Sequence, residues 1–338
     1  MFKLGKTKEE SVGLDIGSYS VKVAAIRKEA GENTLTAYDI KKIPLDQKDI
    51  KVEYRIREAL DEINLHPDTV NLSISGPDVI VRFINLPKMN REQLQNAMVF
   101  EAEKYIPFNI SEVVLDFIIL GNAPEAGQMR VLLAAAKRET VESRVKVIED
   151  LNMTVNAMDI NPFAVFNAFT ESYPLSGDDG NAFLDLGHSG TDVLVSIGEI
   201  PCFMRQIQIG GKDVADAICH NLSVSQEKAE EYKVGLGGPD KEAITQATVP
   251  ILDDLITEVQ LSFGYFENRY NKGVSNIYCS GGMIFQEGVA DYLTKKLGIQ
   301  VKKWNPVEGI GISENLSRED IDSVASQLAV SIGLALRD

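Results

Sequence analysis

The stretch SVGLDIGSYSVKVAAI, residues 11–26, decides how this sequence folds. An apolar run over 12–16, a turn over 17–20 and a second apolar run over 21–26 predict a β-hairpin. Asp15 interrupts the apolar pattern just before a turn that is rich in backbone N–H donors. A single aspartate of this kind has an ordinary explanation, because polar residues often end strands and short motifs recur by chance.

A second stretch, FLDLGHSGTDVLVSI (residues 183–197), repeats this pattern. Asp185 lies 170 residues after Asp15 in a chain of 338, so the two hairpins open two halves of similar length. This self-similarity indicates an internal duplication. Two such turns that face each other would aim backbone N–H groups at one anion from both sides. The two aspartates would flank that anion and would suit a hydrated Mg²⁺.

Composition excludes several classes of function. At 338 residues and 44% hydrophobic, the chain can bury a core and form two or more domains. A formal net charge of −16 argues against binding to nucleic acid and against unaided binding to anionic lipid. The longest apolar runs, such as VLLAAA (131–136), are too short to span a bilayer, and no secretory signal is recognisable, so we expect a cytoplasmic protein. Three scattered cysteines support neither a disulfide framework nor a zinc site.

Periodicity predicts an α/β domain that contains a small inserted subdomain. The first part has a strand at 34–43, a helix at 52–63 and a strand at 69–76. A denser α+β order follows, with strands at 79–86, 113–120, 130–136 and 154–159 and helices at 91–106 and 139–152. Asn90 and Gln93 predict a capping box for the first of these helices, and Pro107 predicts its end.

The second half is more helical. QIGGKDVADAI (208–218) places Gly210 and Gly211 before a helix, and further helices are expected at 225–233 and 242–270, with Pro250 at a start or a kink. NIYCSGGMIFQEGVADYLTKKLG (276–298) predicts a strand, a diglycine and a helix. Glycines at such a turn let the backbone approach a ligand near a helix N-terminus, although they also occur there for steric reasons alone.

The ordered set of two Asp-x-Gly hairpins, the diglycine at 210–211, AEEYK (229–233) and SGGM (280–283) resembles the actin-like ATPase superfamily over nearly the whole chain. The resemblance implies an α/β fold of two lobes around a nucleotide cleft, with ATP and Mg²⁺ as ligands. Asp15 and Asp185 are then the catalytic and metal-binding aspartates. The cofactor-binding residues that the resemblance implies are Gly17, Ser18, Tyr19, Ser20, Lys22, Gly187, His188, Ser189, Gly190, Thr191, Gly210, Gly211, Glu230, Lys233, Gly281, Gly282 and Met283. Glu230 and Lys233 are the Glu-x-x-Lys pair for adenine and ribose, and an ordinary solvated helix face is the alternative for that pair.

Four stretches are similar to the PilM family of type IV pilus assembly proteins. They span 86–121, 132–169, 304–310 and 331–338. The FtsA family of cell-division proteins shares an inserted subdomain of this type, but it ends in a membrane-binding amphipathic helix. Here the apolar stripe Val324, Leu328, Ile332 and Leu336 predicts a packed core helix before the last residue, Asp338, which favours PilM.

The PilM resemblance implies a cytoplasmic ATP-binding adaptor of the pilus inner-membrane assembly platform. Its partner would be the N-terminal cytoplasmic peptide of a PilN-like membrane protein, so the adaptor would reach the inner membrane only through that partner. The expected domains are 1–86 (first lobe), 87–159 (inserted subdomain) and 160–338 (the rest of the core, the second lobe and a C-terminal helix that returns to the first lobe). FEAEKYIPFN (100–109) offers Phe100, Tyr105, Ile106 and Phe108 beside Glu101 and Glu103 for a basic peptide, with Phe100 and Ile106 expected in the core.

Asn161 stands at the expected catalytic position and predicts weak ATP hydrolysis. Many actin-like ATPases have a Glu-Pro pair at this position, whereas this chain has Asn161-Pro162, and an amide cannot accept a proton as a base can. Asn161 would also serve as an N-cap with proline at N1. Two alternatives stay open at this point: a filament-forming protein of the FtsA kind, and a small-molecule kinase on the same fold.

Overall fold

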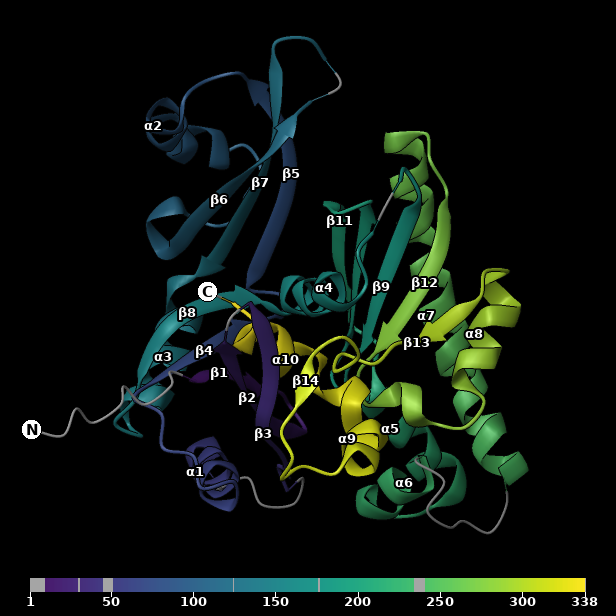
Figure 1. Cartoon of the computed structure of the whole chain (residues 1–338). Coiled ribbons are helices and arrows are strands. Elements are labelled where there is room, and N and C mark those ends of the chain that lie inside the picture. The colour runs from purple at the N-terminus through teal and green to yellow at the C-terminus, as the bar shows by residue number, and fades with distance from the viewer. Residues whose placement is uncertain are drawn as a thin grey trace, which may run out of the picture.

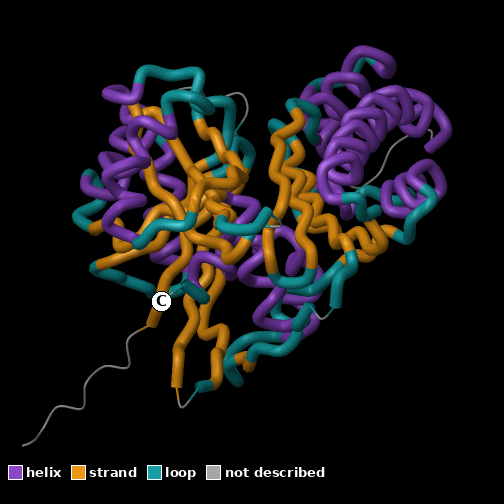
Figure 2. The backbone as a smooth tube through the Cα atoms, turned by 90° about the horizontal axis from the view of Figure 1, so that it is seen from above, coloured by secondary structure: helices purple, strands orange, loops and turns teal. Residues whose placement is uncertain are grey.

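The computed structural model describes residues 10–29, 31–44, 51–123, 125–175, 177–233 and 241–337. The described strands form three sheets of six, five and three strands. The two larger sheets are the centres of two lobes, and the smallest sheet projects from the first lobe (Figures 1 and 2). This arrangement confirms the predicted α/β fold of two lobes with a small inserted subdomain.

The first lobe is built on the hairpin predicted at its start. Strands β1 (Glu10–Ile16) and β2 (Ser20–Glu29) pair antiparallel, which places Asp15 directly opposite Lys22. The sheet order is β14-β3-β2-β1-β4-β8, with β4 parallel to β1 and β8 parallel to β4. The other elements are β3 (Glu32–Lys42), β4 (Thr69–Ile74), β8 (Thr154–Ile160), β14 (Gly311–Ile312), α1 (Val52–Glu62) and α3 (Arg138–Glu149). Helices α1 and α3 share one apolar cluster with the sheet through Ile56 and Ile148.

The second lobe repeats this topology, as the duplication predicts. Its sheet has the order β11-β10-β9-β12-β13, in which an antiparallel hairpin is again flanked by a third antiparallel strand and a parallel one. The strands are β9 (Gly180–Leu186), β10 (Thr191–Ile197), β11 (Ile200–Ile207), β12 (Val274–Ser280) and β13 (Val301–Lys303). The helices are α5 (Gly211–Leu222), α6 (Gln226–Lys233), α7 (Lys241–Tyr270) and α8 (Val289–Leu297).

One helical expectation in this lobe is narrowed and another was wrong. Pro250 lies inside α7, which excludes a helix start at this residue and leaves the kink as the alternative. The diglycine after β12 leads into a short 3₁₀ turn, η2 (Met283–Phe285), and α8 begins only at Val289. Gly288 has a φ of 82°, a left-handed conformation that an α-helix cannot contain, and it separates the two segments.

A helical layer joins the lobes. The chain enters the second lobe through α4 (Asn161–Ser172) and returns through α9 (Arg318–Val324), η3 (Ala325–Leu328) and α10 (Ala329–Ala335). Helix α10 packs against α4 and against β1 of the first lobe. The approach is so close that a Cβ on Gly333 would lie 1.8 Å from the carbonyl oxygen of Ala164. The predicted apolar stripe packs in the core, with Leu328 and Ile332 fully buried and Val324 and Leu336 partly buried, but α9, η3 and α10 replace the single helix that was expected.

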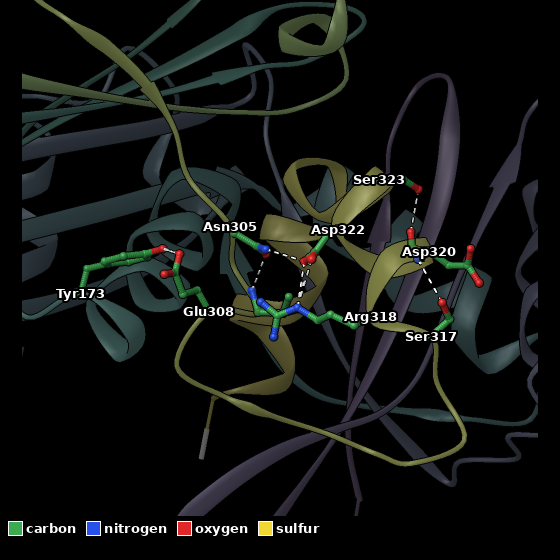
Figure 3. Close-up of polar contacts among 9 residues, drawn as sticks. Tyr173, Asn305, Glu308, Ser317, Arg318, Asp320, Asp322 and Ser323 are labelled. Carbon is green, nitrogen blue, oxygen red and sulfur yellow. Dashed lines mark hydrogen bonds and ion pairs between the residues drawn. The ribbon is translucent and has the colours of Figure 1, made fainter.

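Polar contacts fix the segment before α10 (Figure 3). The hydroxyl of Tyr173, just after α4, donates to Glu308. Arg318 Nε and Asn305 Nδ2 both donate to Asp322 Oδ1, at 3.0 and 2.7 Å. These contacts tie α9 to the loop before it and hold the returning chain in place.

The inserted subdomain is the three-stranded sheet β5-β7-β6 with α2 on one face. Its elements are β5 (Val79–Pro87), α2 (Arg91–Ala102), η1 (Ile110–Glu112), β6 (Val113–Asn122) and β7 (Gln128–Lys137). Both boundaries of the inserted subdomain differ from those predicted. Strand β5 pairs within this sheet, whereas β8 pairs in the first-lobe sheet and α3 packs on it. The subdomain therefore covers 79–137 rather than 87–159.

Helix α2 confirms the predicted capping box and corrects two other expectations. Asn90 Oδ1 accepts from the Gln93 N–H at 2.8 Å, and Gln93 Oε1 accepts from the Asn90 N–H at 2.9 Å. The helix ends at Ala102, well before Pro107. Ile106 is buried as expected, but Phe100 is 70% exposed. Leu94, Met98 and Ala102 form the inner face at a spacing of four residues, so Phe100 points outward.

Candidate functional site

The first loop, residues 17–20, connects β1 to β2 at the end of the central strand. The Gly17 N–H donates to the Ser20 carbonyl at 3.1 Å, and a Cβ on Gly17 would lie 3.0 Å from that oxygen, so the turn is tight. Lys22 Nζ donates to Asp15 Oδ2 at 2.8 Å. The lysine predicted to meet phosphate is thus held beside the loop by Asp15.

The second loop, residues 187–190, has the same construction. The Gly187 N–H donates to the Gly190 carbonyl at 3.0 Å. Gly210 packs directly on this loop, since a Cβ there would lie 2.6 Å from both the Gly190 nitrogen and the His188 carbonyl oxygen. Thr191 is fully buried, and its hydroxyl donates to the Ile209 carbonyl at 2.8 Å. Gly210 and Thr191 therefore shape the loop from behind.

Asp185 is half-buried beneath the second loop. Its Oδ1 accepts from the Ser280 hydroxyl at 2.8 Å. Burial raises the pKa of Asp185, and the bond from Ser280 and the charge of Lys22 oppose that increase. The charges of Lys22 and Asp15, in the first lobe, thus act on the pKa of Asp185 in the second lobe. The two aspartates therefore face each other across one site.

The two loops meet through an aromatic stack. The rings of Tyr19 and His188 lie 4.8 Å apart with an interplanar angle of 25°. Burial, followed by the charge of Glu230, raises the pKa of Tyr19 to about 12. Burial, followed by the charges of Lys233 and Lys212, lowers the pKa of His188 to about 4, so the imidazole is neutral at pH 7. The contact therefore joins two uncharged rings from opposite lobes.

Glu230 and Lys233 lie under this stack. Lys233 Nζ is 2.6 Å from Glu230 Oε2, and it also donates to the Gly211 carbonyl at 3.1 Å. Both side chains are only 8% exposed, which excludes the solvated helix face that was the alternative for this pair. Burial lowers the pKa of Lys233, and Glu230 opposes that decrease. Glu230 Oε1 and His188 Nδ1 are buried without a hydrogen-bond partner in the described part of the chain.

The SGGM segment (280–283), which the resemblance assigns to cofactor binding, presents backbone more than side chains. Gly281 has a φ of 91°, and a Cβ there would lie 2.4 Å from the Leu186 carbonyl oxygen, so only glycine fits. A Cβ on Gly282 would meet nothing within 4 Å. Met283 is 3% exposed and packs in the second-lobe core, so its side chain does not face a ligand.

Asn161 is not the helix cap that was expected. The N-cap of α4 is Ile160, and Asn161 and Pro162 occupy the first turn. Proline is tolerated there because the first N–H groups of a helix have no intrahelical partner. This leaves the Asn161 amide without a hydrogen bond to the described residues, at the carboxyl end of β8.

Asp192 belongs to the site and was missed in the sequence. It pairs across the sheet with Asp185 on one side and Gln206 on the other, so a polar row crosses four strands from Ser280 to Gln206. Burial, followed by the charge of Asp185, raises the pKa of Asp192 to about 7. Its Oδ1 is buried and has no hydrogen-bond partner within the described ranges. The available signal was an aspartate inside an apolar strand, the same feature that singled out Asp15.

The described part of the chain holds no group of three or more His, Cys, Asp or Glu side chains placed to hold a metal ion. The facing aspartates instead suit a hydrated cation that an anionic ligand helps to bind. In the same described part, no helix is long and apolar enough to cross a bilayer.

Comparisons with known proteins identify the family and the fold. The family model for the type IV pilus assembly protein PilM matches residues 13–338. A solved PilM-PilN type IV pilus biogenesis complex contains a chain that is 28% identical, with 98% of each chain covered and a TM-score of 0.87.

Two more distant structures share the fold. The ethanolamine utilization protein EutJ from Carboxydothermus hydrogenoformans is 13% identical over 97% of this chain and 89% of its own, with a TM-score of 0.57. MreB5 of Spiroplasma citri, solved bound to ADP, is 11% identical over 96% and 94%, with a TM-score of 0.52.

Proposed function

The chain belongs to the PilM family of type IV pilus assembly proteins, and on this premise we propose that it is an ATP-binding adaptor for a PilN-like membrane protein. The observation that carries the nucleotide part is the meeting of two glycine-rich loops from duplicated lobes, marked by the Tyr19–His188 stack. Loops of this kind bind phosphate through successive backbone N–H groups.

The residues present fit ATP with Mg²⁺. Gly17, Gly187 and Gly282 would bring backbone close to the ligand, and Asp15 and Asp185 would orient a hydrated Mg²⁺ through its waters. Glu230 Oε1 and His188 Nδ1 lie 3.7 Å apart and have no hydrogen-bond partner among the described residues, so both could bond to ribose hydroxyls. When bound, the metal ion would offset the charge of the phosphates.

The adaptor part rests on the apolar surface of the inserted subdomain. Ten large apolar side chains are exposed in the described part of the chain, and six of them lie in this subdomain. They are Val99, Phe100, Tyr105, Val114, Ile118 and Ile119. Glu103 and Glu112 of the same subdomain are also exposed, whereas Glu101 is already paired with Lys104 at 2.8 Å. Such a surface suits an extended basic peptide with aliphatic side chains.

The solved PilM-PilN complex supports a PilN-like partner. We propose, as the sequence resemblance implies, that the docking element is the N-terminal cytoplasmic peptide of that inner-membrane protein. The adaptor would then be cytoplasmic and would lie at the inner membrane through that peptide. A formal net charge of −16 disfavours direct contact with anionic lipid, which supports this indirect route.

Two binding experiments test the proposal. Mass spectrometry of nucleotide that co-purifies with the protein should detect ATP or ADP, and calorimetry should show ATP binding. A synthetic peptide with the N-terminal sequence of the PilN-like partner should bind wild type and should bind Phe100→Asp at least tenfold more weakly, about 1.4 kcal/mol. Tyr265→Asp is the matched control, because Tyr265 is 54% exposed on the second lobe. Equal loss in both variants would exclude the inserted subdomain as the docking site.

Sedimentation and ATP consumption distinguish the adaptor from the two alternative functions. A filament former of the FtsA kind would sediment with ATP at micromolar concentration, and a small-molecule kinase would consume ATP only with its acceptor. The adaptor should remain in the supernatant and should bind the peptide without turnover.

A further inference from the structure

Strand β11 contacts both the second loop and the inserted subdomain. At its carboxyl end, Ile207 pairs with Thr191, and the Ile207 carbonyl oxygen lies 2.8 Å from where a Cβ on Gly190 would be. Toward its amino end, the Cys202 carbonyl accepts from the Tyr270 hydroxyl at 2.9 Å. Arg130 of β7 approaches the Cys202 sulfur at 3.6 Å. One strand of the second lobe thus connects the two binding regions proposed above.

Tyr270 and two arginines form the contact at this end, and we call these three residues the Tyr270 bridge. The Arg130 and Arg269 guanidinium carbons lie 5.1 and 5.7 Å from the centroid of the Tyr270 ring. Arg269 Nη2 also donates to the Phe83 carbonyl of β5 at 2.6 Å. Because Arg130 and Phe83 belong to the inserted sheet and Tyr270 ends α7, the bridge joins the inserted subdomain to the second lobe.

This contact can move without disrupting either sheet. Strands β5 and β11 are edge strands of different sheets, and no backbone ladder connects them in the part of the chain that the structure describes. Beside them, a cavity of about 280 Å³ lies between the residues 79–82 and 204–208. Among the described residues, Arg130 and Arg269 make this contact through the Tyr270 ring, the Cys202 sulfur and the Phe83 carbonyl rather than through ion pairs with carboxylates. Cation–π contacts of this kind contribute about 0.5–2 kcal/mol, which suits a contact that can be broken.

We propose that the Tyr270 bridge couples the nucleotide loops to the peptide surface of the inserted subdomain. A nucleotide that draws the second loop toward the first moves β11 and α7 against β5 and β7, and the bridge transmits this movement to the inserted sheet. The inference rests on the proposed function, since it concerns the regulation of the same two sites. Coupling of this kind is reciprocal, so the peptide changes nucleotide affinity by the same factor.

The experiment measures the affinity of a fluorescein-labelled peptide with the N-terminal sequence of the PilN-like partner, with and without saturating Mg²⁺ and a non-hydrolysable ATP analogue. In wild type, the peptide affinities measured with and without the nucleotide analogue should differ by about fivefold or more, and we call this factor the coupling ratio. In Tyr270→Leu and Arg269→Gln the ratio should fall to about one, while each ligand still binds by itself. The exposed pair on α1 supplies matched controls, Tyr54→Leu and Arg57→Gln, which should keep the wild-type ratio.

The outcomes separate the two proposals. A wild-type ratio in the bridge variants, or a ratio of one in wild type with both ligands bound, overturns the coupling and leaves the adaptor function intact. Failure of wild type to bind either ligand overturns the function instead. Hydrogen exchange of β5 and β11 in wild type provides a test that needs no variant. Protection there should change when the ATP analogue is added, and unchanged protection would contradict the bridge.

Discussion

Asp15 and Asp185 occupy equivalent positions in the two lobes but have different partners. Asp15 forms an ion pair with Lys22, whereas Asp185 accepts a hydrogen bond from the Ser280 hydroxyl. Removing the Asp15 carboxylate frees the Lys22 ammonium to meet a phosphate directly. The loss of ATP affinity on removing the Asp15 carboxylate should therefore depend on whether Mg²⁺ is present.

Asp15→Ala should weaken Mg²⁺·ATP about tenfold or more, about 1.4 kcal/mol, while metal-free ATP binds no more weakly than to wild type. Calorimetry with Mg²⁺ and with EDTA measures both affinities. Asp39→Ala is the control, because Asp39 pairs with Lys41 on the same sheet, away from the loop. Equal Mg²⁺·ATP affinity in Asp15→Ala and wild type would remove Asp15 from the metal site.

Asp192 gives a prediction about pH. Its folded-state pKa of about 7 lies above the ordinary value of 3.8, so between these values the folded state holds a proton that the unfolded state has released. Stability then falls as pH rises through this window, by up to about 1.4 kcal/mol per pH unit for one group. Asp192→Asn should flatten urea-denaturation stability between pH 5 and 7 and should be more stable than wild type at pH 8. The exposed Asp116→Asn should keep the wild-type slope.

Asn161 gives a prediction about rate. An amide cannot act as a general base toward an attacking water, so hydrolysis should be slower than about one turnover per second. Phosphate release under saturating Mg²⁺·ATP measures this rate, and Asn161→Glu should raise it. A faster wild-type turnover would mean that another group activates the water.

At the scale of elements, α2 depends on its cap. The reciprocal bonds of Asn90 and Gln93 satisfy N–H groups that the helix itself cannot. Asn90→Ala should cost about 1 kcal/mol, measured as faster hydrogen exchange in α2 and a lower midpoint in urea. Asn96→Ala, at an exposed position within the same helix, should be neutral or slightly stabilising. Similar losses in both variants would show that the cap is unimportant.

At the scale of the molecule, the acidic chain should reach a membrane only through its partner. Liposomes with anionic lipid should float the protein when a tethered partner tail is present and should leave it at the bottom of the gradient otherwise. The net charge of −16 disfavours direct contact, and high salt should not create it. Flotation without the tail would replace the adaptor with a protein that attaches to lipid directly.

The sequence by itself determined the two hairpins, the duplication, the order of most elements and the α2 capping box. These features depend on local periodicity and on turn and cap residues, which act over a few positions of the chain. The aspartates and glycines of both loops were identified for the same reason.

Only the tertiary structure decided which of these residues meet. The Tyr19–His188 stack, the burial of Glu230 and Lys233 and the polar row through Asp192 join segments far apart in the chain. The boundaries of the inserted subdomain depend on β5 pairing with β7 and β8 pairing with β4, and no local pattern specifies either pairing. Burial and pKa shifts follow from these long-range contacts, because a side chain loses its water only when distant parts of the chain pack around it.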